Sequence, residues 1–313
     1  MGLLRKDYIL DRWVYYASSR GKRPREFKTV AVKEESKTCL FCPGNENLTP
    51  REIGRMEYKG DWKMRWFPNK FPAVGTAHKH SIKSKGFITE GYAFGLHEII
   101  AETNHHKSQL ADLPVSQIRE LLEVYKVRVK ELSRIKDVKY VQIFKNHGKE
   151  AGTSLVHSHS QVVALPEMPE LVREEISAAK RFRKCPYCDI VKLESKSKRK
   201  IFETKNILAF APFASRFNYE AWIFTKQHKS SLEELSEGEL TDLAIALKKI
   251  VSRLKKINAS YNFFLHYAPG KDNLHLHIEI TPRTATWAGF EFSTNSTINS
   301  VTPEDAARFY KRE

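Results

Sequence analysis

Two cysteine pairs are the residues of this sequence whose spacing points most directly to chemistry. Cys39 and Cys42 form one Cys-x-x-Cys pair, and Cys185 and Cys188 form the other. Two thiolates at this spacing supply half of a tetrahedral zinc site, which imidazoles commonly complete. The N-terminal apolar stretch is too short for a signal peptide, so the pattern favours metal chemistry over a disulfide framework. A redox dithiol is the alternative interpretation.

Histidines follow each cysteine pair and supply the remaining ligand candidates. For the first pair they are His106 with His157 or His159, and for the second pair His228 with His275, His277 or His266. Thiolate and imidazole donors suit zinc, and iron is the alternative metal because imidazole also binds it. The sequence therefore predicts two zinc sites, of which the second has the less certain metal and ligand set.

A third pattern places polar side chains at every second position of an apolar segment. Successive residues of a strand alternate between its faces, so His157, His159 and Gln161 share one face, about 6–7 Å apart along the strand. Ser158 and Ser160 then point the other way. A neutral imidazole in this setting can act as a nucleophile and hold a substrate fragment covalently. Two buried histidines with a purely structural role are the alternative.

These landmarks recur in the same order in both halves of the chain. Each cysteine pair is followed by an Asn-containing segment, a strand, an amphipathic helix, another strand, a Gly-containing loop and a His-x-His strand. In the second half, Ser236 and Glu239 form a capping box that opens the helix. The order predicts an internal duplication, with a domain at 1–170 and a second at 171–313.

The predicted fold class is α+β, with two antiparallel sheets that are each crossed by one main helix. We expect the two sheets to join or to face each other around the site. Only the first half carries the complete His-x-His-x-Gln pattern. Glu279 stands at the position equivalent to Gln161, so we expect the second half to have a structural role.

Composition limits the partners. Lys and Arg number 53 against 37 Asp and Glu, a net charge of +16, which suits either nucleic acid or phosphorylated small molecules. The positive residues are spread along the chain without a nucleic-acid recognition motif, so we expect no nucleic-acid partner. No apolar run approaches the roughly 20 residues that span a bilayer, so we expect a cytoplasmic protein without membrane contact.

The residues from Asn146 to Pro166 resemble the active-site strand of the galactose-1-phosphate uridylyltransferase family, a branch of the histidine-triad superfamily. That family carries His-Pro-His-x-Gln, and here Ser158 replaces the proline, which resembles the subgroup that includes the plant ADP-glucose phosphorylase. The similarity extends over almost the whole chain. It includes the first cysteine loop, the segment after Asn69, and the C-terminal segments 289–292 and 303–307.

The resemblance implies a role for each matching residue. His159 is the expected nucleophile that forms a nucleotidyl-histidine, and Gln161 is expected to hydrogen-bond the transferred phosphoryl group. The other expected substrate contacts are Arg20, Arg23, Asn146, Gly152 and Ser154 along the phosphates and Asn69 near the nucleoside. The expected zinc ligands are Cys39, Cys42, His106 and His157 at the first site and Cys185, Cys188, His228 and His275 at the second. The resemblance implies two Cys and two His at the second site in the plant-like subgroup, and one Glu and three His in the bacterial enzymes. His266 and His277 match ligands of the bacterial pattern, so the second ligand set stays open.

The expected function is that of a zinc-containing nucleotidyltransferase in galactose metabolism, acting as a homodimer. It would exchange UMP between UDP-glucose and galactose-1-phosphate in two steps. The close alternative is adenylyl transfer from ADP-glucose or a dinucleoside polyphosphate to phosphate. A nucleic-acid-binding protein with inactive halves is a further alternative. A hydrolase is disfavoured because the Gln161 amide is neither an acid nor a base near neutral pH.

Overall fold

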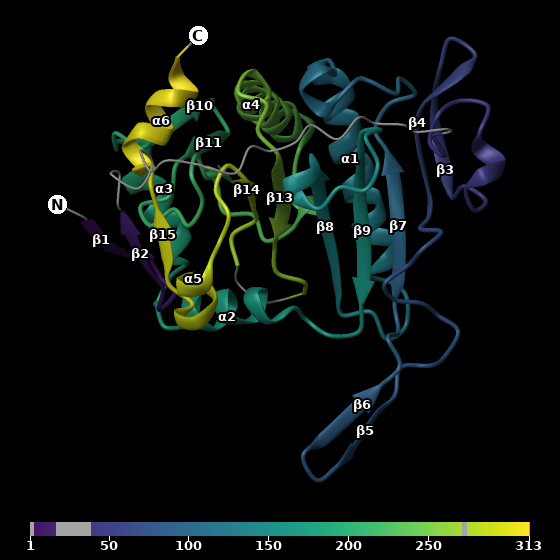
Figure 1. Cartoon of the computed structure of the whole chain (residues 1–313), viewed down its shortest axis with the longest axis horizontal. Helices are drawn as coiled ribbons and strands as arrows, with labels where there is room; N and C mark the ends of the chain where they lie inside the picture. The colour runs from purple at the N-terminus through teal and green to yellow at the C-terminus, as the bar shows by residue number, and fades with distance from the viewer. Residues whose placement is uncertain (1–2, 17–38, 271–273, 313) are drawn as a thin grey trace.

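A single ten-stranded antiparallel sheet runs through the molecule, which the computed structural model describes for residues 3–16, 39–270 and 274–312 (Figure 1). Side chains from the two halves of the sequence therefore share one continuous scaffold. The strand order is β10 (Lys200–Glu203), β11 (Ile207–Phe210), β12 (Ala221–Thr225), β14 (His277–Pro282), β13 (Tyr261–His266), β8 (Tyr140–His147), β9 (His159–Leu165), β7 (Leu96–Ala101), β4 (Asp61–Pro68) and β3 (Gly54–Tyr58).

The two halves of the sheet meet at the pair β8–β13. These strands run antiparallel, with Asn146 opposite Asn262 and Phe144 opposite Phe264. Outward from this pair, the order β9, β7, β4, β3 in the first half matches β14, β12, β11, β10 in the second. The predicted duplication of an α+β unit is confirmed, and the two sheets are joined rather than stacked.

One long helix from each half packs beside the other. Helix α1 spans Val115–Leu132 and helix α4 spans Glu237–Lys256, and the two contact each other. The predicted capping box is present, because the Ser236 hydroxyl accepts from the Glu239 amide while the Glu239 carboxylate accepts from the Ser236 amide. The apolar residues predicted to share one face of α1 are buried: Ile118, Leu121, Leu122, Tyr125, Val129 and Leu132. Each buried side chain of this size contributes roughly 1.5–3 kcal/mol.

The N-terminal strands lie against the second half of the chain. Strands β1 (Leu3–Lys6) and β2 (Trp13–Tyr16) form a small sheet with β15 (Thr297–Asn299). Arg5 pairs with Glu304 at 3.0 Å in α6 (Pro303–Lys311), and α5 (Gly289–Thr294) precedes β15. We propose that the repeated units divide at 170/171, with residues 3–16 crossing onto the second unit.

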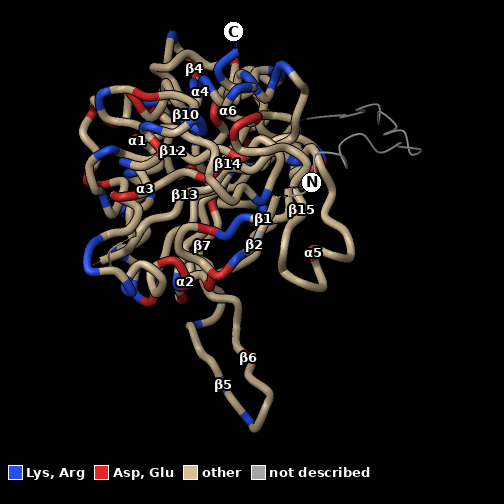
Figure 2. The backbone as a smooth tube through the Cα atoms, turned by 90° about the vertical axis from the view of Figure 1, so that its left-hand side faces the viewer, with Lys and Arg blue, Asp and Glu red and all other residues tan. Residues whose placement is uncertain are grey.

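Short elements complete the fold. Helices α2 (Glu170–Ala179) and α3 (Pro186–Ser195) connect the halves, and a hairpin of β5 (Ile82–Lys85) and β6 (Ile88–Gly91) projects from the body (Figures 1 and 2). The 3-10 turns are η2 (Glu46–Leu48), η3 (Leu110–Asp112), η4 (Lys149–Ala151) and η5 (Leu232–Glu234).

The lysines and arginines lie on many separate elements (Figure 2). This dispersion agrees with the spread along the sequence. None of the helices among the described residues is long and apolar enough to cross a membrane.

Candidate active site

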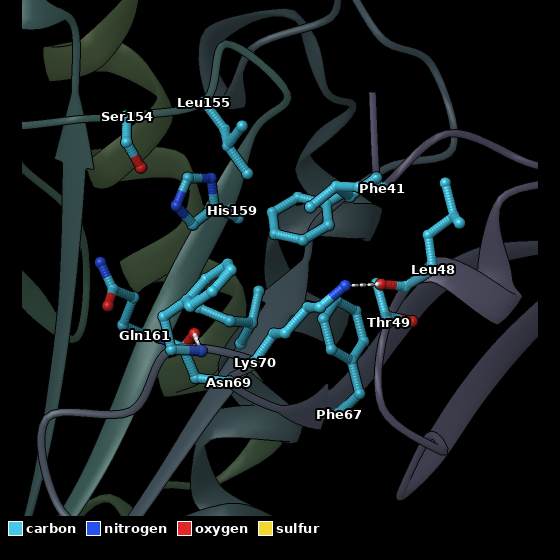
Figure 3. Close-up of a pocket in the computed structure, with 13 residues that line it drawn as sticks. Phe41, Leu48, Thr49, Phe67, Asn69, Lys70, Ser154, Leu155, His159 and Gln161 are labelled. Carbon is cyan, nitrogen blue, oxygen red and sulfur yellow. Dashed lines mark hydrogen bonds between the residues drawn. The ribbon is translucent and has the colours of Figure 1, made fainter. Parts of the chain in front are cut away.

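Strand β9 carries two of the predicted site residues into a cavity of about 240 Å³ (Figure 3). His159 and Gln161 are two positions apart, so both point to the same face of the sheet. The opposite wall comes from the first cysteine loop, β4 and the segment after it. The cavity is lined by Leu40, Phe41, Leu48, Thr49, Phe67, Asn69, Lys70, Phe71, Ile99, Ser154, Leu155, His159 and Gln161.

The protonation pattern of His159 follows from its hydrogen bond. Its Nδ1 lies 2.8 Å from the backbone carbonyl oxygen of His157, and a carbonyl can only accept, so Nδ1 carries the hydrogen. In the neutral ring Nε2 therefore keeps a free lone pair. Burial disfavours the imidazolium and lowers the pKa of His159. The ring thus favours its neutral form, with the Nε2 lone pair free at the cavity wall.

A buried ion pair lies on the opposite face of the same strand. Lys145 Nζ donates to Glu102 Oε2 at 2.8 Å, to Ser158 Oγ at 3.0 Å and to the carbonyl oxygen of His159 at 3.0 Å. Ser158 and Ser160 both donate to Glu102, as expected for side chains that point away from the cavity. Burial alone would raise the pKa of Glu102, but the Lys145 charge and the hydrogen bonds from Lys145, Ser158 and Ser160 together outweigh it and lower that pKa.

The first cysteine pair meets the histidines that the sequence suggested. Cys39 Sγ lies 3.5 Å from His157 Nδ1, and Cys42 Sγ lies 3.4 Å from His106 Nδ1. One donor atom from each of the four residues lies within 4.8 Å of the others, as a four-coordinate zinc site requires. Thr103 accepts from His157 Nε2 at 2.7 Å, which leaves Nδ1 as the ligand atom.

The second cysteine pair forms an equivalent cluster. Cys188 Sγ lies 3.5 Å from His228 Nδ1 and 3.7 Å from His275 Nδ1, and Cys185 completes the group. Thr225 Oγ1 contacts His275 Nε2 at 2.9 Å, again leaving Nδ1 for the cluster. Burial and the neighbouring Cys185 raise the pKa of the Cys188 thiol to about 12, so a cation is needed to stabilise its thiolate at neutral pH.

The alternative ligands of the second site gather in a separate buried cluster. His266 and His277 lie with Glu175 and Glu279, and not with the cysteines. His266 Nδ1 lies 3.0 Å from Glu175, and Arg216 lies 3.2 Å from Glu279. Burial opposes the charged form of His266, but the charge and hydrogen bond of Glu175, together with the charge of Glu279, outweigh it and raise the pKa of His266. The Arg216 guanidinium therefore offsets the charge of Glu279, while Glu175 favours the protonated form of His266.

The other predicted substrate contacts fall into three groups. Asn69 and Ser154 line the cavity. The Asn146 side chain accepts from Asn262 at 2.8 Å where the two halves meet, and Gly152 ends the turn η4 with φ at +81°. Neither of these lines the cavity of Figure 3. Arg20 and Arg23 lie outside the described residues.

Two residues near the cavity were not singled out by the sequence. His97, in β7, contacts Gln161 with Nε2 at 2.9 Å from Oε1, although the sequence suggested no function for it. Lys70 lines the cavity beside Asn69, and its Nζ donates to the Leu48 carbonyl at 3.3 Å. The signal available for Lys70 was its place in the segment after Asn69. No sequence signal tied His97 to Gln161, because their contact depends on the register of β7 and β9.

Comparisons with known proteins agree with this architecture. The family model for the N-terminal domain of galactose-1-phosphate uridyl transferase matches residues 4–169, and a domain model of unknown function matches 89–309. An ADP-glucose phosphorylase of Arabidopsis thaliana is 32% identical, covering 97% of this chain and 91% of that protein. A galactose-1-phosphate uridylyltransferase of Thermotoga maritima is 31% identical, covering 97% and 96%.

A solved structure supports the same assignment. The crystal structure of an ADP-glucose phosphorylase from Arabidopsis thaliana with bound ADP-glucose has a TM-score of 0.85 and 29% identity, covering 100% of this chain and 99% of that one. The fold and the sequence together define a protein of the histidine-triad type. The chain belongs to the galactose-1-phosphate uridylyltransferase family, which here includes ADP-glucose phosphorylase.

The two cysteine clusters predict the metal content. We expect two zinc ions per chain by inductively coupled plasma mass spectrometry, with Cys42→Ser and Cys188→Ser each losing one because a thiolate ligand is removed. The control variant His159→Ala should keep both. If Cys188→Ser keeps two metals while His266→Ala loses one, the second site uses the alternative ligands.

The buried Lys145–Glu102 pair predicts a large loss of stability on truncation. Lys145→Met leaves the Glu102 charge buried without its partner, which should lower the free energy of unfolding by about 3–5 kcal/mol in chemical denaturation. The exposed pair between Lys139 and Glu167 offers a control, since Lys139→Met should change it by less than about 1 kcal/mol. Equal losses in the two variants would show that the buried pair is not a major stabilising contact.

Proposed function

We propose that this protein is a nucleotidyltransferase that carries a nucleoside monophosphate covalently on His159. The observation that carries the proposal is the hydrogen bond from His159 Nδ1 to the His157 carbonyl. It leaves Nε2 as the nucleophilic nitrogen of a neutral ring beside an open cavity. Family membership supports the same chemistry, since the relatives above are named as a uridylyltransferase and a phosphorylase.

The reaction divides into two displacements at phosphorus. In the first, the Nε2 lone pair of His159 attacks the α-phosphorus of a nucleoside diphosphate sugar. A phosphorus–nitrogen bond forms, and the sugar-1-phosphate leaves with the electron pair of the broken phosphorus–oxygen bond. In the second, a phosphate oxygen of the acceptor attacks the same phosphorus and returns the electron pair to Nε2. Each step exchanges one bond for another, and no proton transfer is needed.

Gln161 suits a transferase more than a hydrolase. Its amide donates hydrogen bonds but does not accept a proton from water near neutral pH. We propose that it holds the transferred phosphoryl group while the covalent intermediate waits for a phosphate acceptor. Asn69, Ser154 and Lys70 line the same cavity, which supports substrate contacts for them. Arg20, Arg23, Asn146 and Gly152 remain proposed phosphate contacts on the family pattern.

The metal sites are proposed to have a structural role. A closed set of two thiolates and two imidazoles leaves no open position for substrate, and such zinc sites stabilise the local fold. His157 belongs to the first cluster and also supplies the carbonyl that binds His159. We therefore propose that the first zinc fixes the backbone from which His159 projects. The second cluster would hold the start of α3 to β14.

The first candidate for the reaction is exchange of UMP between UDP-glucose and galactose-1-phosphate. The second candidate is adenylyl transfer from ADP-glucose to phosphate. The second is favoured by the pair Cys185 and Cys188 in the second cluster, which resembles the plant-like subgroup, and by the 32% identity to the plant phosphorylase. The apolar walls from Phe41, Phe67 and Phe71 can pack against either base. The predicted homodimer rests on the family resemblance alone.

A covalent adduct on His159 is the direct consequence of the proposal. After incubation with UDP-glucose or ADP-glucose in separate reactions, intact-mass spectrometry should show a gain of one UMP or one AMP. His159→Ala should show no gain, because the nucleophile is absent. The donor that gives the adduct identifies the base. No adduct from either donor would remove His159 from its proposed role.

The proposed role of Gln161 predicts how fast water hydrolyses the covalent intermediate. Gln161→His places a group that can accept a proton beside the phosphoryl group, so hydrolysis of the nucleotide sugar without acceptor should rise by about tenfold or more. Release of nucleoside monophosphate, followed by chromatography, measures this rate, and Gln161→Asn is the control that adds no base. An unchanged hydrolysis rate in Gln161→His would count against the proposed role of the amide.

A further inference from the structure

His97 lies on the strand next to the one that carries His159 and Gln161. In the pairing of β7 with β9, Ile99 is opposite Gln161 and His97 is opposite Val163. Residues two apart on a strand share a face, so His97 points to the cavity side of the sheet with Gln161. Its Nε2 lies 2.9 Å from the Gln161 Oε1 atom.

The backbone fixes the tautomer of His97. The amide nitrogen of Ala73 donates to His97 Nδ1 at 3.1 Å, and a backbone N–H can only donate. Nδ1 is therefore the acceptor, and the hydrogen of the neutral ring is on Nε2. Burial lowers the pKa of His97, which favours this neutral form. Consequently Nε2–H donates to the Gln161 carbonyl oxygen.

This hydrogen bond settles which end of the Gln161 amide is available to a ligand. The oxygen is occupied by His97, so the NH₂ group is the end that can donate into the cavity. The two ends of an amide have nearly the same shape, and only their hydrogen bonds distinguish them. A flipped amide would present an oxygen lone pair to a phosphoryl oxygen, which is repulsive. The orientation of the amide therefore decides whether Gln161 attracts or repels the proposed intermediate.

Asn69 is oriented by the same residue. Its backbone N–H donates to the His97 carbonyl at 2.7 Å, and its Oδ1 accepts from the Phe71 amide at 2.9 Å. Asn69 Nδ2 lies 3.2 Å from His97 Nε2, but both atoms carry hydrogens in this tautomer, so neither can accept from the other. The Asn69 NH₂ group, like that of Gln161, keeps its donors for a ligand.

We propose that His97 is a positioning residue that fixes the Gln161 amide with its NH₂ group toward the transferred phosphoryl group. The proposal rests on the proposed function, because it gives the orientation of Gln161 a role in nucleotidyl transfer. His97 does not touch the reacting atoms. It acts through Gln161, and its Nδ1 holds the cavity-lining segment that follows Asn69.

Two substitutions distinguish the role of Nδ1 from the role of Nε2. In His97→Asn the side-chain oxygen can take the place of Nδ1 and accept from Ala73, but no donor reaches Gln161. In His97→Gln the longer amide can donate to Gln161 from the place of Nε2. The control is His78→Asn, the same substitution at a histidine that stacks on Tyr92 and does not line the cavity.

The experiment measures single-turnover formation of the His159 adduct from the donor that labels the wild-type protein. We expect His97→Asn to lower the maximal rate about tenfold or more with less than a threefold change in the half-saturating donor concentration. His97→Gln should stay within about threefold of wild type, as should His78→Asn. The loss in His97→Asn should not add to that of Gln161→Ala in the double variant, because both remove the same oriented amide.

Four outcomes would overturn the inference. One is equal rates in His97→Asn and His97→Gln, and another is full additivity of His97→Asn with Gln161→Ala. Either would show that His97 does not act by orienting the Gln161 amide. If the wild-type protein forms the adduct and His97→Asn forms it at the same rate, this inference is rejected but the proposed function is not. Absence of an adduct in the wild-type protein would reject the proposed function and this role with it.

Discussion

The hydrogen bond between His159 Nδ1 and the carbonyl of His157 is the contact on which the candidate site depends. At 2.8 Å it leaves only Nε2 of His159 with a free lone pair. The same residue that supplies the carbonyl has its imidazole in the first cysteine cluster. The first cysteine cluster and His159 are therefore coupled through a single residue, and a shift of His157 would change both the orientation and the tautomer of His159.

The second half of the chain repeats this hydrogen bond in different surroundings. His277 Nδ1 lies 2.8 Å from the carbonyl of His275, as His159 does from His157. Its surroundings differ, however, because Trp222 lies opposite Glu279, where the first half has Ile99 opposite Gln161. The large indole and the stacked Phe224 bury His277. The backbone hydrogen bond is thus retained in the second half, while aromatic side chains pack against His277 and bury it.

Periodicity and order in the sequence were enough to predict the repeated elements, because strands and helices bury residues at fixed spacing. The grouping of Cys39 and Cys42 with His106 and His157 also followed from residue types and the family pattern. What the sequence could not reveal depends on pairing between strands that are far apart along the chain. His97 and Gln161 are 64 positions apart, and their contact requires the exact register of β7 and β9.

The partner of Asn146 was likewise not predictable from the sequence, because it depends on the register between β8 and β13. The family pattern suggests a phosphate contact for Asn146, which stays a prediction, and the structure adds that its side-chain oxygen accepts from the Asn262 amide at 2.8 Å. A polar residue at the junction of two halves satisfies a partner in the other half, and a motif read along one segment contains no information about that partner. Nearby, Lys70 Nζ donates to the Leu48 carbonyl at 3.3 Å, so the segment after Asn69 contacts the residues that follow the first cysteine loop.

The serine in place of the family's proline is explained by what lies behind the strand. Ser158 Oγ donates to Glu102 Oε2 at 2.6 Å and accepts from Lys145 at 3.0 Å. A proline there would remove both hydrogen bonds and leave two buried charges with fewer partners, which is unfavourable in a low-dielectric interior. Lys145 also binds the carbonyl of His159. Ser158, Glu102 and Lys145 therefore form one interdependent unit, and the strand that carries His159 is held by charge on one face while its other face stays open to the cavity.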